Sequence, residues 1–379
     1  MNLLLIAYRI LTHERARNAL AISGIFIAIL LIFLQLGFYA SVPRSGMLFY
    51  DAMRFDILLT SKSYVFEGQP FSFPRRRLYQ ALSLPEVVRA MPVYHNIGRW
   101  LNTEARLARD VFVVGFNPSD PVFNVDDIER QTAVLRYSDI ILVDVATRSQ
   151  FGPIVPGRRV EIEQRAVTIG GVYDLGTRSR IERPGVILTS DLNFVRIFTQ
   201  QQLNEINLGL VLLNSGTDPN EVAARLQSIL PPDTRVFTRI ELALHETGYW
   251  VQLTSIGLIF GFGTIIAVVV GSVILNQTLT AQITRNLPQY ATLKAMGYSD
   301  HYLVGIVVLL ATIMVMISYV PAVVTAILIY AVIRRITSLP AEMTIPRLIG
   351  VLSIAWTMSV ASALLSLRAM RRADPADLF

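Results

Sequence analysis

This chain of 379 residues is strongly apolar: 53% of its residues are hydrophobic, 16% are charged and the mean hydropathy is +0.48. That composition excludes a disordered chain and is atypical of a soluble globular protein. The net charge of +6 arises outside residues 43–250, because that stretch carries 23 basic and 23 acidic residues. The basic excess therefore does not indicate a nucleic-acid-binding domain, which would carry it on its polar part.

The uncharged stretch at residues 18–42 is the first of four apolar segments; the others occupy residues 251–283, 302–333 and 348–367. A helix that spans a bilayer needs ~20 mostly apolar residues, so each segment is long enough to cross. The first is too long for a signal-peptide apolar region, and no small-residue cleavage site ends it cleanly, so we expect a retained anchor. Pro321 predicts a kink or break near Tyr319 in the third span.

Arginines flank the first and last spans, and cytoplasmic loops are enriched in Lys and Arg. With four spans, both termini and the 284–301 loop are expected in the cytoplasm, and residues 43–250 outside it. Arg334, Arg335 and Arg347 flank the short loop 334–347, which this topology places outside the cytoplasm, and so they do not follow the rule. Snorkelling of their side chains or a domain boundary would explain arginines on that side.

The polar stretch between the first two spans predicts a mixed α/β domain with a β-rich insertion at about 122–200. The chain has no cysteine, so this domain depends on its core rather than on disulfides. Strands are predicted at 56–60, 111–116, 140–145, 159–162, 167–172, 185–188, 206–213 and 234–238, and helices at 75–82 and 220–230. Four aromatic residues are either an exposed patch for an amphiphile or partner, or ordinary packing beneath a loop: Tyr64, Phe66, Phe71 and Phe73.

Motifs for several kinds of chemistry are missing from the sequence. The only lysines are Lys62 and Lys294, and neither belongs to a Walker A loop, so we expect no ATPase activity and no enzyme. The four histidines have no metal-ligand spacing, and we expect no catalytic residue, metal or cofactor bound by the chain itself. The centres of the spans carry no charged residue, which disfavours an ion-coupled transporter.

Two local motifs remain. Gly257 and Gly261 form a Gly-x-x-x-Gly pair that would allow close helix packing or dimerisation, although glycines are also common in membrane helices. In the 284–301 loop, Pro288 and Gly297 are placed to begin and end a short helix, which is either a plain interfacial helix or a docking element. The candidate docking residues are Arg285, Gln289, Tyr290, Ala291, Leu293, Lys294, Met296 and Gly297.

Residues 289–297 resemble the cytoplasmic motif of the MacB/FtsX-like permease family of ABC transporters, with Gln289 where the family usually has Glu. Residues 5–17 resemble the family's amphipathic elbow helix, which gives a cytoplasmic segment at 1–17. Residues 371–377 resemble its closing segment in the tail 368–379. The amino-acid sequence of residues 288–298 is most similar to the DevC-type branch of the family, which is found in cyanobacteria.

The resemblance implies a permease subunit in a bacterial inner membrane, with a periplasmic α/β domain and export of a glycolipid-like amphiphile. The implied partners are two ABC ATPase subunits that bind ATP and Mg, a second copy of this chain, a membrane-fusion adaptor and an outer-membrane duct. The alternatives are a lipoprotein-release permease, an FtsX-type activator of peptidoglycan hydrolases and a membrane sensor that transports nothing. The short external domain usual in FtsX-type activators counts against the second.

Overall fold

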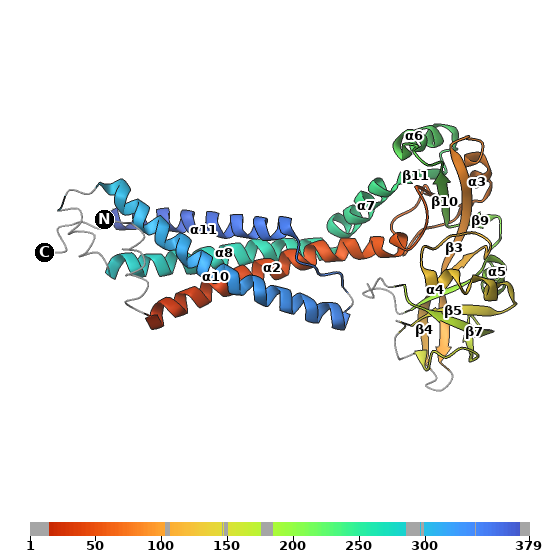
Figure 1. The fold of residues 1–379 in the computed structure, drawn as a ribbon, viewed down its shortest axis with the longest axis horizontal. Helices are drawn as coiled ribbons and strands as arrows, with labels where there is room; N and C mark the ends of the chain where they lie inside the picture. The colour runs from red at the N-terminus through yellow and green to blue at the C-terminus, as the bar shows by residue number, and fades with distance from the viewer. Residues whose placement is uncertain are drawn as a thin grey trace. The chain divides into compact units, whose positions relative to one another are not determined.

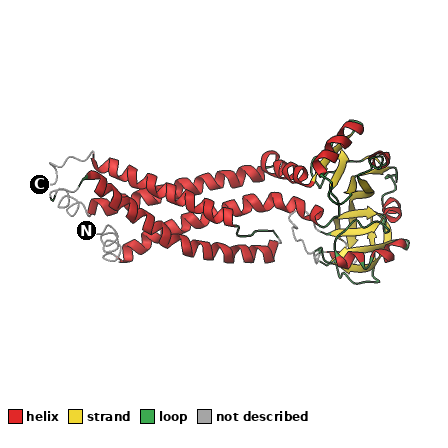
Figure 2. Ribbon diagram, turned by 45° about the horizontal axis from the view of Figure 1, so that its top comes forward, coloured by secondary structure: helices red, strands yellow, loops and turns green. Residues whose placement is uncertain are grey.

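The computed structural model describes residues 15–102, 107–145, 147, 151–175, 185–285, 296, 299–337 and 339–371. The chain divides into two compact units. The membrane unit comprises Met1–Ser41, Ser255–Arg335 and Ala341–Phe379, and the sheet unit comprises Val42–Thr254 with Ile336–Pro340. All described strands belong to the sheet unit, as the yellow arrows in Figure 2 show.

Four described helices are long and apolar enough to cross a membrane, as the sequence predicts. They are α2 (Arg15–Asp51), α8 (Ser255–Arg285), α10 (Asp300–Thr337) and α11 (Ile345–Arg371), labelled in Figure 1. The helix α2 continues to Asp51, beyond the predicted end of the span at residue 42. The helix α10 remains continuous through Pro321, so the chain does not break near Tyr319.

Small residues on α8 allow close packing against α2. A Cβ added at Gly263 would lie 2.6 Å from the side-chain amide of Gln35, and one added at Gly271 would lie 2.8 Å from the Cβ of Ala28. In lipid, where helices gain little from apolar burial against one another, close backbone approach at small residues supplies the packing energy. Close van der Waals packing at these glycines therefore stabilises the contact between α2 and α8.

Hydroxyl and amide groups join α8 to α11. The Ser366 hydroxyl lies 2.7 Å from Asn276 Oδ1, and the Thr280 hydroxyl lies 3.1 Å from Ser366 Oγ. The Ser362 hydroxyl donates to the carbonyl of Ser272 at 3.2 Å. Such bonds contribute about 0.6 kcal/mol each in membrane proteins. We call these five residues the polar seam, and it makes α8 and α11 a connected pair.

The sheet unit contains a nine-stranded sheet in the order β11-β1-β10-β3-β4-β8-β5-β7-β6, with a second pairing between β6 and β3. The pairing of β6 with β3 closes the last six strands of this order into a ring. The strands are β1 (Ile57–Ser61), β3 (Val87–Asn102), β4 (Leu107–Phe116), β5 (Ile140–Asp144), β6 (Arg159–Ile162), β7 (Arg165–Tyr173), β8 (Val186–Ser190), β10 (Leu208–Leu213) and β11 (Thr234–Thr238). A separate pair consists of β2 (Phe73–Pro74) and β9 (Glu205–Ile206).

Strand β3, with 16 residues, is the longest strand, and the sequence patterns did not predict it. It contains Pro92 and Gly98, which ordinarily mark edge strands, bulges or turns. In the structure Pro92 is paired in register with Gly209 of β10, and β3 belongs both to the α/β part and to the ring. The predicted division into an α/β subdomain and an insertion is therefore bridged by one shared strand.

Helices cover both faces of the sheet. On one face α3 (Arg76–Ala81), α5 (Asp191–Ile197) and α6 (Pro219–Ile229) contribute residues such as Leu78, Phe194 and Leu226 to one buried cluster. On the other, the end of α2, α4 (Asp126–Glu129), the 3-10 helix η1 (Thr132–Arg136) and α7 (Arg239–Gly248) contribute to a second cluster. The mixed α/β class that the sequence predicts is confirmed.

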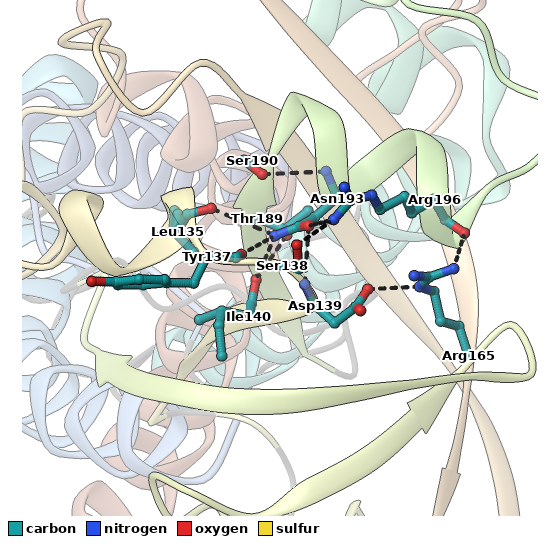
Figure 3. A network of polar contacts seen from close by, with 10 residues as sticks. All are labelled: Leu135, Tyr137, Ser138, Asp139, Ile140, Arg165, Thr189, Ser190, Asn193 and Arg196. Atoms are coloured by element: carbon teal, nitrogen blue, oxygen red, sulfur yellow. Dashed lines mark hydrogen bonds and ion pairs between the residues drawn. The ribbon is translucent and has the colours of Figure 1, made fainter.

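The side chain of Asn193 on α5 organises the segment that leads into β5 (Figure 3). Its Nδ2 donates to the carbonyls of Tyr137 (2.8 Å), Ile140 (3.4 Å) and Leu135 (3.5 Å), and its Oδ1 accepts from the Asp139 N–H at 3.0 Å. Asp139 has φ 61°, a left-handed conformation that costs energy for a residue other than glycine. The buried amide therefore stabilises a chain path that its own residues disfavour.

Buried His95 on β3 predicts acid sensitivity of the sheet unit. Burial lowers the pKa of His95 to about 4 from its ordinary 6.5. The folded chain then binds fewer protons than the unfolded chain, so this contribution to stability is complete above pH 6.5 and is lost as the pH falls towards 4. We expect protonation of His95 to lower the free energy of unfolding by about 3 kcal/mol at pH 4. The substitution His95→Phe keeps a ring that can pack against Phe112, and it should abolish this acid-dependent loss.

Unfolding midpoints of the full chain and of His95→Phe, measured by denaturant titration from pH 7 to pH 4, would show this. As the pH falls from 7 to 4, the unfolding midpoint of the wild type should decrease more than that of His95→Phe. A constant difference would mean that the imidazole does not control acid sensitivity.

Candidate functional site

Most of the predicted docking segment lies outside the described residues. This applies to Gln289, Tyr290, Ala291, Leu293, Lys294 and Gly297. Of the other two, Arg285 is the exposed last residue of α8, and Met296 lies in a turn with 61% of its surface exposed. The docking role of the segment therefore stays a prediction.

Of the predicted glycine pair, Gly257 is buried, whereas Gly261 does not pack closely within the chain. A Cβ added at Gly261 would meet nothing within 4 Å, whereas the same addition at Gly263 or Gly271 would meet α2. A Gly-x-x-x-Gly pattern marks a face of a helix, but it does not say which neighbour that face meets. A contact of Gly257 and Gly261 with another copy of the chain stays a prediction.

Arg347 has a structural role that the charge rule did not reveal. It donates to the carbonyl of Glu342, and its guanidinium lies 5.6 Å from the centre of the Tyr330 ring. Tyr330 in turn donates to the carbonyl of Phe33, so this arginine stabilises one end of the contact between α10 and α2. Arg334 and Arg335 are exposed.

The best-defined polar site among the described residues lies where α7 leads towards α8. A capping box at Thr238 and Glu241 begins α7, and a π-helix (Tyr249–Leu253) follows it. Thr254 is then extended, with φ −108° and ψ 156°, before α8 begins at Ser255. Single π-turns often occur at functional positions, because they interrupt the regular helix and leave it less constrained.

A buried carboxylate of α7 connects three segments of the sheet unit. Glu246 is fully buried and accepts a hydrogen bond from the Tyr64 hydroxyl, which lies 2.6 Å from the Tyr50 hydroxyl. Tyr64 follows β1, and Tyr50 lies near the end of α2. Burial, with the neighbouring Tyr50 and Glu246, raises the pKa of Tyr64 well above its usual value, so Tyr64 remains a hydrogen-bond donor.

The loop after β1 also packs its aromatic rings against α7 and the π-helix. The Phe66 ring stacks on Tyr249 with centroids 4.3 Å apart and 6° between their planes. One residue before it, the carbonyl of Val65 lies 3.0 Å from Nε2 of His245. We call the following set the clasp: Tyr50, Tyr64, Phe66, His245, Glu246 and Tyr249.

The clasp settles most of the aromatic question that the sequence left open. Tyr64 and Phe73 are each 3% exposed, and Phe66 is stacked, so these three pack in the domain. Only Phe71, which is 48% exposed, remains on the surface. In the sequence, the only sign of the clasp was the presence of Tyr64 and Phe66 shortly after a predicted strand. Nothing in that pattern indicated Glu246 as their partner.

The contacts of the clasp join three segments of the sheet unit. The described part of the chain contains no group of three or more His, Cys, Asp or Glu residues that could hold a metal. Oε1 of Glu246 accepts from the Tyr64 hydroxyl, and the rings of Tyr50 and Tyr64 belong to the second apolar cluster. What such a site can do is hold three segments in one arrangement.

The fold defines a membrane protein with four apolar helices and a mixed α/β domain outside the cytoplasm. Residues 18–229 match the MacB-like periplasmic core domain, and residues 260–375 match the FtsX-like permease C-terminal family. The chain belongs to the MacB/FtsX-like permease family, the permease component of ABC transporters. Comparison with curated proteins found no match.

Three solved structures are distantly similar to this chain. The periplasmic region of MacB from Actinobacillus actinomycetemcomitans is 8% identical, with a TM-score of 0.36 over 50% of this chain and 92% of that one. The extracellular domain of the transporter YknZ from Gram-positive bacteria is 14% identical, with a TM-score of 0.34 over 48% and 99%. A domain of a putative permease from Porphyromonas gingivalis is 19% identical, with a TM-score of 0.29 over 41% and 73%. The family assignment therefore rests on the two family matches.

Proposed function

We propose that this chain is the permease subunit of a MacB-like exporter and passes ATP-driven motion from cytoplasmic ATPase subunits to the domain outside. The observation that carries the proposal is the presence of both family matches, at 18–229 and 260–375, in one chain that lacks a Walker A loop. ATP and Mg would bind to two copies of the partner ATPase, and a second copy of this chain would complete the permease. Both termini would lie in the cytoplasm.

The packing of the membrane unit supports transmission from the 286–299 connection. This segment lies between α8 and α10 in the chain. The polar seam connects α8 to α11, and Ser318 of α10 donates to the Ile22 carbonyl of α2 at 3.0 Å. A push on the connection would therefore move two pairs of helices rather than two isolated ones.

The proposed substrate is a glycolipid-like amphiphile, and the proposed route is a tripartite assembly with a membrane-fusion adaptor and an outer-membrane duct. The similarity of residues 288–298 to the DevC-type branch supports both.

Substitutions in the connection test the docking role. We expect Lys294→Asp combined with Ala291→Arg to lower ATPase binding and permease-dependent ATP hydrolysis at least tenfold, because an inverted charge and a new long side chain would enter the contact. The measurement is pull-down and ATP hydrolysis with the cognate ATPase in nanodiscs. Arg334→Asp, the same kind of charge inversion at the exposed far end of α10, is the control and should change neither. Unchanged hydrolysis in the double variant would show that the ATPase docks elsewhere.

A further inference from the structure

The clasp has a specific place in the chain. Its loop, with Tyr64 and Phe66, follows β1, which lies between β11 and β10 in the sheet, and the N–H of Lys62 donates to the carbonyl of Asp233 at 2.8 Å. This loop contacts Glu246 of α7 and Tyr249 of the π-helix. Only Thr254 separates that π-helix from α8.

The loop of the clasp is internally stiff. The N–H of Gln69 donates to the carbonyl of Phe66 at 2.8 Å, and the N–H of Tyr64 donates to the carbonyl of Ser61 at 3.0 Å. A Cβ at Gly68 would lie 2.5 Å from the Phe66 ring, so the turn closes tightly around that ring. A displacement of the ring therefore displaces the loop and the end of β1 with it.

Separation of the clasped segments is unfavourable. The carboxyl group of Glu246 is fully buried, and moving α7 away from Tyr64 would break the hydrogen bond between these two buried polar groups. The segment after the clasp is different, because a π-turn followed by an extended residue leaves the helical hydrogen-bond ladder interrupted. Hydrogen bonds and ring contacts thus connect α7 to the loop after β1. Between α7 and α8, in contrast, the helix is interrupted.

We propose that the clasp is the connection through which displacement of α7 and the π-helix reaches β1 and the central sheet. This inference rests on the proposed function, because that function supplies the motion. It assigns to Tyr64, Phe66 and Glu246 a positioning role in transmission that is separate from ATPase docking.

Hydrogen exchange of the full chain, with its ATPase in nanodiscs, tests this role. Amide exchange is compared in peptides covering β1 and α7, with and without a trapped nucleotide state. We expect nucleotide to alter exchange in both peptides of the wild type. In Tyr64→Phe combined with Phe66→Leu, the change in α7 should persist and the change in β1 should fall at least threefold. Glu246→Leu, which removes the oxygen that accepts from Tyr64, should give the same uncoupling if the double variant does not fold.

Tyr79→Phe is the matched control, because Tyr79 is 63% exposed on α3, and it should leave both changes intact. An undiminished change in β1 of a folded clasp variant would overturn the proposal. A second arm omits the ATPase: the clasp variants should speed exchange in the loop after β1 at least threefold, and an unaltered rate would also overturn it. If that arm succeeds but nucleotide alters neither peptide in the wild type, the proposed ATP-driven motion has failed, and the transmission role fails with it.

Discussion

Replacing Gly37 by alanine is expected to destabilise the membrane unit strongly. The added Cβ would lie 2.2 Å from the Tyr330 hydroxyl oxygen and 2.5 Å from the adjacent ring carbon. Tyr330 is buried and donates to the carbonyl of Phe33, so its ring can avoid the new methyl group only by leaving that contact, and overpacking of this kind costs about 1–3 kcal/mol or more. The melting temperature of the purified chain should fall by roughly 6–12 °C for a loss of about 3 kcal/mol.

Gly350→Ala is the matched control for this prediction. It makes the same change in another membrane helix, α11, where a Cβ would meet nothing within 4 Å, and it should leave the melting temperature almost unchanged. Tyr330→Ala should reduce the effect of Gly37→Ala, so that the double variant is more stable than the sum of the two losses predicts. Equal effects at Gly37 and Gly350, or strict additivity with Tyr330, would contradict the close contact.

Replacing Asn193 by aspartate is expected to destabilise the sheet unit, although the two side chains have nearly the same shape. The substitution removes the Nδ2 donors and places a carboxylate oxygen near the carbonyl oxygens of Tyr137 and Ile140. Asn193 is 2% exposed, so water cannot supply the missing bonds. A loss of about 3 kcal/mol follows from leaving several buried groups unpaired, and urea unfolding of the full chain would measure it.

Asn204→Asp provides the comparison. Asn204 is exposed, and its backbone carbonyl, which the substitution keeps, accepts from the N–H of Arg75, so the change should stay within about 0.5 kcal/mol. Acidification offers a further check, because protonating the new carboxyl at position 193 returns one donor. The deficit of Asn193→Asp should therefore narrow at low pH, and a deficit that widens would argue against the donor role of Nδ2.

Local pattern was sufficient for much of the fold. The membrane spans follow from long apolar runs, since a helix in lipid must satisfy its own backbone hydrogen bonds and can expose only apolar side chains. Strands β1, β10 and β11 and helix α6 were likewise predicted, because alternation and the cap at Asp218 are properties of neighbouring residues. Helices α5 and α7 were not predicted, even though Thr238 and Glu241 form a capping box.

Strand β3 shows why local pattern then failed. Pro92 and Gly98 look like interruptions until Gly209 of the neighbouring strand and the pairing with β6 are known. The same limit applies to α8, where the sequence does not reveal that Gly263 and Gly271 meet α2.

The sequence by itself determined the membrane class, the four spans, the mixed α/β domain and the family. Each of these depends on composition, on periodicity or on a contiguous motif. Only the tertiary structure decided that β3 closes the ring, that Asn193 supports Asp139, and that Glu246 meets Tyr64 across 182 residues of chain. Those contacts depend on which surfaces meet after folding, and residues far apart in the chain carry no local sign of their partners.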